Sequence, residues 1–187
     1  MDANSHNGAE RATRFSAALS RARTGDDTTW RRTTEAANAA YATGDLRHAI
    51  DLYREALDEA ERLFAAASFS SVPVPVIYNI SCHNLAEIVE RSGDEGAAED
   101  FLVRAYDKLL ASAASPETPL PLRLDCVRHL KHALAQLVQH LRRRAAPDAR
   151  IARYVDTAKT TAFAVFHAAK HAEIADLNCD HCAVRPS

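Results

Sequence analysis

The sequence predicts an all-α protein, and three of its features support that prediction. The chain of 187 residues is 47% hydrophobic, which is enough to build one folded domain with its own core. Ala is frequent throughout whereas Gly occurs only 5 times, a composition that favours helices over strands. Apolar residues recur every three or four positions between short Gly-Asp and Pro-rich segments. We expect these segments to separate six main helices.

The first two of these helices form a predicted hairpin. One begins near Trp30 and ends at Thr43-Gly44-Asp45, where Gly can close a helix and Asp can cap the next one. The other runs from Leu46 to about Ala67 and places its apolar residues on one face. Residues 1–28 are polar, and we expect them to form a flexible tail or a loose helix.

A second hairpin repeats the first. Pro73 and Pro75 interrupt the chain, a helix then runs from about Val76 to Ser92-Gly93-Asp94, and another continues to Leu110. The two Gly-Asp turns are 49 positions apart, and small residues match when the turns are superposed: Ala37 with Ala86, Ala49 with Ala98, and Ala56 with Ala105. A repeat of this kind indicates architecture, not catalysis.

Two longer helices follow. The Pro-rich segment 115–121 begins a helix from about Leu120 to about Arg144, and Pro147-Asp148 opens the last helix, which we expect to end near Asp176. The predicted helical domain is therefore 29–177. Residues 178–187 form a tail that contains Cys and His, and a reversal of the chain would return this tail toward the last helix or toward the third.

Several residues of the two hairpins together carry a family resemblance: Ala37, Gly44, Asp45, Ala49, Tyr53 and Ala56 in the first, and Asn84, Leu85, Ala86, Gly93, Asp94, Ala98 and Ala105 in the second. With them, segments 30–64 and 79–112 resemble the tetratricopeptide repeat (TPR) family. The chain departs from that family at Thr33 and Cys82, where the family usually has a large aromatic residue. Its two units also repeat after 49 residues, whereas the usual repeat of the family is about 34 residues long. It is also similar to small bacterial repeat proteins that combine a Cys-His pair in the second unit with a C-terminal C-x-x-C.

The TPR resemblance implies a short right-handed solenoid of about three antiparallel hairpins, the last of which acts as a cap. It also implies a concave groove, lined by the helices that begin near Trp30, Val76 and Leu120, which holds a partner peptide or protein. An adaptor or scaffold is therefore expected. Some family members grip a carboxylate with Lys, Arg and two Asn, but Thr34 stands where the first Lys would be. The candidate groove residues are Arg31, Asn38, His83, Asn84 and Glu87.

A transition-metal site is the alternative function. His167 and His171 are four residues apart and share a helix face, and Cys179-Asp180-His181-Cys182 supplies a C-x-x-C pair. Two imidazoles and two thiolates suit tetrahedral zinc, or copper(I). Further candidate ligands are Cys82, His83 and His181.

Simpler interpretations of these residues stand beside the metal site. The two His can lie on a solvated face, the C-x-x-C can be a chance pair or a redox dithiol, and Cys82 can be a buried thiol. A second His group, formed by His129, His132 and His140, lies among Arg and Lys residues and predicts a solvated basic face.

Several classes of function are disfavoured. No H-E-x-x-H motif, phosphate-binding Gly-rich loop or G-x-S-x-G motif is present, so an enzyme is not expected. The 23 basic and 25 acidic residues give a net charge of −2, which argues against a nucleic-acid partner. The chain has no signal-like apolar N-terminus and no stretch of about 20 apolar residues, so we expect a cytoplasmic protein without a membrane partner. In that compartment the 4 Cys residues are expected as thiols.

Overall fold

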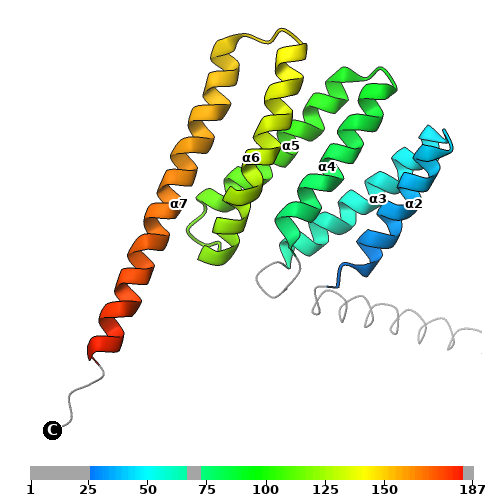
Figure 1. Ribbon diagram of the computed structural model, residues 1–187. Coiled ribbons are helices and arrows are strands. Elements are labelled where there is room, and N and C mark those ends of the chain that lie inside the picture. Colours follow the sequence, from blue (N-terminus) through cyan, green and yellow to red (C-terminus); the bar gives the residue numbers. More distant parts are fainter. Residues whose placement is uncertain (1–25, 67–72, 183–187) are drawn as a thin grey trace, which may run out of the picture. The chain divides into compact units, whose positions relative to one another are not determined.

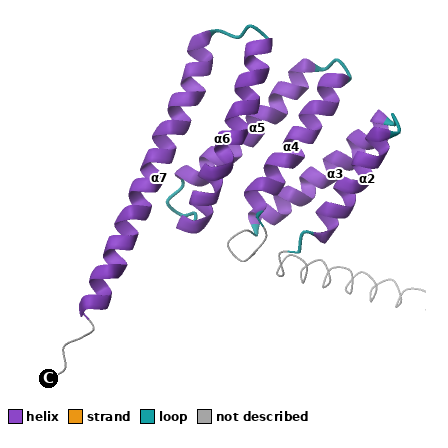
Figure 2. Ribbon diagram, in the orientation of Figure 1, coloured by secondary structure: helices purple, strands orange, loops and turns teal. Residues whose placement is uncertain are grey.

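The computed structural model describes the backbone of residues 26–66 and 73–182 and the side chains of 26–66 and 73–172. Within these ranges the chain forms six helices and no strand, which confirms the all-α prediction (Figure 1, Figure 2). The chain divides into two compact units, one ending at Gly93 and the other beginning at Asp94.

The first unit contains α2 (Thr28–Ala42), α3 (Leu46–Ala65) and α4 (Val74–Arg91). Helix α3 packs against both α2 and α4 (Figure 1). Fully buried Ala side chains, including Ala37, Ala49 and Ala60, let the helices approach closely, and Leu63 and Leu85 fill the core between them.

Helix α4 begins two residues earlier than the sequence predicts, because Pro75 falls within its first turn. A proline is tolerated there because the first N–H groups of a helix have no partner within the helix, so the missing N–H of proline breaks no hydrogen bond. The rings of Tyr78 and Phe64 meet edge to face, with centroids 5.6 Å apart, and join α4 to α3.

The two Gly-Asp turns have the same local structure. Gly44 and Gly93 have φ angles of +83° and +86°, in the left-handed region that glycine adopts without strain. Asp45 then caps α3 by accepting a hydrogen bond from the His48 amide at 3.2 Å. Asp94 caps the following helix in the same way, from the Ala97 amide at 2.9 Å. The sequence repeat is therefore also a repeat of turn geometry.

The second unit contains α5 (Glu95–Ala114), α6 (Leu120–Arg143) and α7 (Asp148–Cys182). Helix α6 packs against α5 and α7, and α7 also contacts α5. The Tyr106 hydroxyl donates to the backbone oxygen of Tyr154 at 2.7 Å, and the two rings meet edge to face with centroids 5.0 Å apart. The remaining core consists of apolar residues of all three helices, including Leu109, Leu130, Leu137 and Val165.

Helix α7 corrects the sequence analysis. It is helical through Cys182, so the expected end near Asp176 and the reversal of the chain after it are wrong. No Gly or Pro occurs between Asp176 and Cys182, so nothing in the local sequence stops the helix. In Figure 1 the C-terminal part of α7 extends beyond the rest of the second unit. None of the helices in the described ranges is long and apolar enough to cross a lipid bilayer.

Candidate functional site

In the first unit, polar side chains lie along one side of α2 and one side of α4, which together we call the α2–α4 face. Six of them are exposed or half-buried, namely Trp30, Asn38, Tyr41, Asn84, Glu87 and Arg91, and two are buried, namely Thr34 and Ser81. Within each helix these residues are three or four positions apart, so they lie on one side of it. Hydrogen bonds between side chains join the two helices at two points along this face.

One point is near the start of α2. The Trp30 indole Nε1 donates to Ser81 Oγ at 2.8 Å, and the same hydroxyl donates to the Ile77 backbone oxygen at 3.0 Å. This leaves the Ser81 hydroxyl with a fixed orientation, because its proton is already committed. The indole ring is thereby held against α4.

The other point is near the end of α2. The Tyr41 hydroxyl donates to Glu87 Oε1 at 3.1 Å and accepts a hydrogen bond from Arg91, whose guanidinium carbon lies 5.1 Å from the centre of the Tyr41 ring. Burial, followed by the hydrogen bond to Glu87, raises the pKa of Tyr41 above 10.0. The phenol therefore stays neutral near pH 7, and its O–H group donates to Glu87.

Two side-chain amides lie between these points. Asn38 is exposed, and its Oδ1 accepts a hydrogen bond from the Tyr53 hydroxyl at 2.7 Å. That bond uses the amide oxygen of Asn38, and among the described residues nothing accepts a hydrogen bond from its two N–H donors. Asn84 of α4 is half-buried.

The structure thus gathers three of the five predicted groove residues, Asn38, Asn84 and Glu87, on one face. His83 is half-buried on α4 beside them. Arg31 is exposed and forms an ion pair with Asp27 at 2.8 Å; the hydrogen bond between the two raises the pKa of Arg31.

Thr34 of α2, in contrast, is buried.

Four residues of the α2–α4 face were not predicted: Trp30, Tyr41, Ser81 and Arg91. Tyr41 follows Asn38 by three residues and Arg91 follows Glu87 by four, so helical spacing could have identified both. Ser81 precedes Asn84 by three residues and has the same spacing, but its hydrogen bond to Trp30 depends on which side of α4 packs near α2.

The candidate metal ligands are only partly brought together. His167 and His171 are both exposed on α7, with their Nε2 atoms 3.3 Å apart, and Phe163 stacks on His167 with centroids 6.1 Å apart. The side chains of Cys179, His181 and Cys182 lie outside the described residues. Cys82 is fully buried in the first unit.

Because α7 is continuous, it separates the two halves of the predicted ligand set. Its rise of about 1.5 Å per residue places Cys179 about 12 Å beyond His171 along the axis. The side chains of Cys179 and Cys182 lie outside the described residues, so of this ligand set the structure describes only the His pair. Across the described side chains, no group of three or more His, Cys, Asp or Glu residues is arranged to hold a metal.

The second His group also differs from its prediction as a solvated basic face. His132 is exposed and His129 is half-buried, with a pKa lowered by burial and by His132. His140 is fully buried, and its Nε2 lies 3.9 Å from Glu99 Oε2, so α6 turns this residue inward. The predicted stripe assumed one exposed side of α6, but α5 and α7 both pack against that helix.

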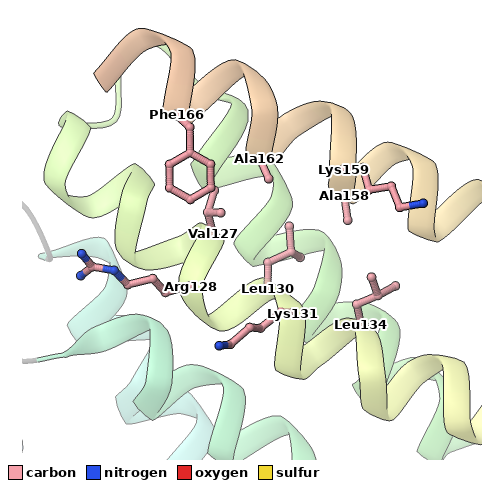
Figure 3. Close-up of a pocket in the computed structure, with 9 residues that line it drawn as sticks. All are labelled: Val127, Arg128, Leu130, Lys131, Leu134, Ala158, Lys159, Ala162 and Phe166. Atoms are coloured by element: carbon pink, nitrogen blue, oxygen red, sulfur yellow. The ribbon is translucent and has the colours of Figure 1, made fainter. Parts of the chain in front are cut away.

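The second unit contains a cleft of 380 Å³ between α6 and α7, which the sequence analysis did not predict. In Figure 3, Leu130 and Leu134 of α6 point toward α7, and Phe166 of α7 points toward Val127. Ala158 and Ala162 leave room between the helices because their side chains are short. Arg128, Lys131 and Lys159 complete the lining.

Comparison with known proteins places the chain in a family but adds no described activity. No curated protein and no solved structure matches the chain significantly. The family model described as "Protein of unknown function (DUF2753)" matches residues 28–171, from the first residue of α2 to the second His of the α7 pair. This match covers most of the helical region, and the chain belongs to the DUF2753 family.

Proposed function

We propose that this protein is a non-enzymatic, TPR-like interaction module that binds an extended peptide of a partner protein along the α2–α4 face. The observation that carries the proposal is the Asn38 amide, which the Tyr53 hydroxyl orients from 2.7 Å so that its N–H donors are available to a ligand. An extended peptide presents alternating C=O and N–H groups, which side-chain amides can pair with on both their donor and acceptor atoms.

Two further features support this proposal. The Trp30–Ser81 and Tyr41–Glu87 hydrogen bonds fix α2 and α4 on either side of the two Asn residues, so little order has to be gained on binding. The repeated Gly-Asp turns agree with the TPR resemblance, whose members use the first helix of each hairpin to hold peptides. The expected compartment is the cytoplasm.

Peptide selection followed by substitution tests this function. A phage library of random 12-residue peptides is selected on the full chain, and a labelled selected peptide is titrated by fluorescence polarisation. We expect Asn38→Ala/Asn84→Ala to weaken binding about 30-fold, since two hydrogen bonds contribute about 2 kcal/mol together. Tyr53→Phe, which releases the Asn38 amide, has a smaller effect in the same direction.

Gln139→Ala is the matched control, because it removes an exposed side-chain amide from α6 in the other unit. It should leave the affinity unchanged. Selection of no peptide above background, or equal affinities for the double variant and the control, would contradict the proposal.

Transition-metal binding is a second candidate function, and the His167–His171 geometry favours it. Two imidazole nitrogens bound tetrahedrally to zinc at about 2.0–2.1 Å are about 3.3–3.4 Å apart. The observed separation of the Nε2 atoms, 3.3 Å, is close to this value. Elemental analysis of protein purified under reducing conditions, with His167→Ala and Cys179→Ser/Cys182→Ser in parallel, tests this. Near-stoichiometric zinc or copper that the His167→Ala variant lacks would support it, and metal-free protein in every sample would reject it.

A further inference from the structure

The α6–α7 cleft can accommodate apolar side chains of a ligand. Its walls are made by Val127, Leu130 and Leu134 on one side and Ala158, Ala162 and Phe166 on the other, as Figure 3 shows. Its volume of 380 Å³ lies in the range of about 300–1,000 Å³ that is typical of ligand clefts.

The surface beside the cleft also remains open in the second unit. Phe163 and Phe166 are 73% and 55% exposed, whereas large apolar residues are usually covered. A helix laid in the groove between α6 and α7 would pack against both helices and cover Phe166, as helices do when ridges of side chains fill grooves.

The positive charge of the residues that line the cleft favours a partner helix that carries negative charge. Three cationic residues, Arg128, Lys131 and Lys159, line the cleft, and no acidic residue does. Arg128 pairs with Asp125 at 2.7 Å, and Lys159 lies 4.0 Å from Asp156 with both side chains about three-quarters exposed. Lys131 is exposed and makes no ion pair with any residue in the described ranges. A ligand with carboxylates beside its apolar face would gain attraction from these cations at the rim.

Charge also argues against the chain's own N-terminal segment as the occupant. Residues 10–23 contain four Arg and one Glu, so this segment has the same sign of charge as the lining of the cleft. Like charges across an interface disfavour association.

We propose that the α6–α7 cleft is a docking site for an acidic amphipathic helix of a partner protein. Its apolar side chains enter between Leu130, Leu134 and Ala162, and its Glu or Asp residues face Lys131 and Lys159. This site lies in the second unit and is independent of the peptide-binding role proposed for the α2–α4 face.

The test uses a displayed library of 18-residue helices with Leu fixed at positions i, i+3, i+4 and i+7. The flanking positions vary among Glu, Gln and Lys, and the library is selected on the full chain. We expect enrichment of Glu, and binding that weakens as salt is raised. Enrichment of Gln or Lys, or no selection, would overturn the proposal.

Paired variants then locate the bound helix. Ala162→Trp fills the cleft, and Lys131→Glu reverses a charge at its rim; we expect losses of affinity of at least about 10-fold and about 3–10-fold respectively. Their controls are Ala164→Trp and Lys170→Glu, which change exposed residues of α7 that do not line the cleft. If circular dichroism shows that Ala162→Trp is misfolded, the affinities of Lys131→Glu and Lys170→Glu for the selected helix still show whether the helix binds at the cleft.

Two outcomes identify another occupant or another site, and each overturns the proposal. A dimer of the wild-type chain in light scattering that Ala162→Trp converts to a monomer would assign the cleft to a second copy. Affinity for the selected helix that drops in Asn38→Ala/Asn84→Ala, but not in Lys131→Glu, would place the helix on the α2–α4 face. Because the two sites have separate variants, failure here leaves the test of the proposed function unaffected.

Discussion

Gly44 and Gly93 show how single residues position the helices of this protein. Both adopt positive φ angles at the end of a helix, and a Cβ atom built on either one would meet no heavy atom within 4 Å. A larger side chain would therefore fit at both positions, and crowding is not the reason that glycine is needed there. The requirement is the left-handed backbone, which costs other L-residues about 1–2 kcal/mol.

Alanine substitutions at the three described glycines should therefore change the free energy of unfolding in different directions. We expect Gly44→Ala and Gly93→Ala each to lower the free energy of unfolding by about 1 kcal/mol. Gly96→Ala is the control: Gly96 lies in the first turn of α5 without a positive φ, and its added Cβ would make an ordinary 3.7 Å contact with Asp94. This change should be neutral or stabilise the protein by up to about 1 kcal/mol. Urea denaturation measures all three, and a loss at Gly96 equal to the others would contradict the backbone argument.

At the scale of elements, α2 depends on α4 as well as on α3. Helix α2 has 15 residues, and its N-cap residue Asp27 makes no side-chain cap, although Asp26 Oδ1 accepts a hydrogen bond from the Thr28 amide at 2.9 Å. Its last turn has no basic residue, so its C-terminus gains no charge stabilisation there. Its packing on α3 and the Trp30–Ser81 and Tyr41–Glu87 hydrogen bonds therefore hold it in place.

Removing the bond near the start of α2 should loosen that helix selectively. Trp30→Phe keeps a ring but loses the indole N–H, and we expect a cost of about 1 kcal/mol with faster amide hydrogen exchange in α2. Ser81→Ala and the double variant complete a thermodynamic cycle. Coupling close to zero would show that ring packing, and not the hydrogen bond, holds α2.

At the scale of the whole molecule, the free energy of unfolding depends on pH because a buried phenol and a buried thiol keep their protons in the folded chain. Burial raises the pKa of Tyr106 from 10.0 to about 12, and burial raises the pKa of Cys126 from 9.0 to about 12. Between the ordinary and the raised pKa values the folded chain retains protons that the unfolded chain releases. The stabilisation from these groups is therefore complete below about pH 9 and is lost as the pH rises toward 12.

Alkaline denaturation should show this linkage. We expect the free energy of unfolding, measured in urea at pH 7 to 11, to be level at first and then to fall as the pH passes 9 and 10. Tyr106→Phe and Cys126→Ala should each reduce the slope at high pH, whatever their effect on stability at pH 7. A slope that neither variant changes would assign the alkaline loss to other groups.

The sequence by itself determined the helices and their turns, because these depend on contacts between residues close in the chain. The all-α class, the Gly-Asp turns and the burial of Ala37, Ala49 and Ala56 all follow from helix propensity, capping and apolar spacing. The end of α7 was misjudged where the local sequence contains no residue that stops a helix.

Only the tertiary structure decided which helix faces meet. Spacing could place Asn38 and Asn84 on helix faces, but the packing of α2, α3 and α4 decided that Tyr53 orients the first and that Trp30 bonds to Ser81. In the same way, packing buried His140, which the sequence placed in solvent, and left a cleft between α6 and α7. A helical pattern specifies the direction of each side chain around its own axis, whereas the partner it meets depends on how distant helices pack.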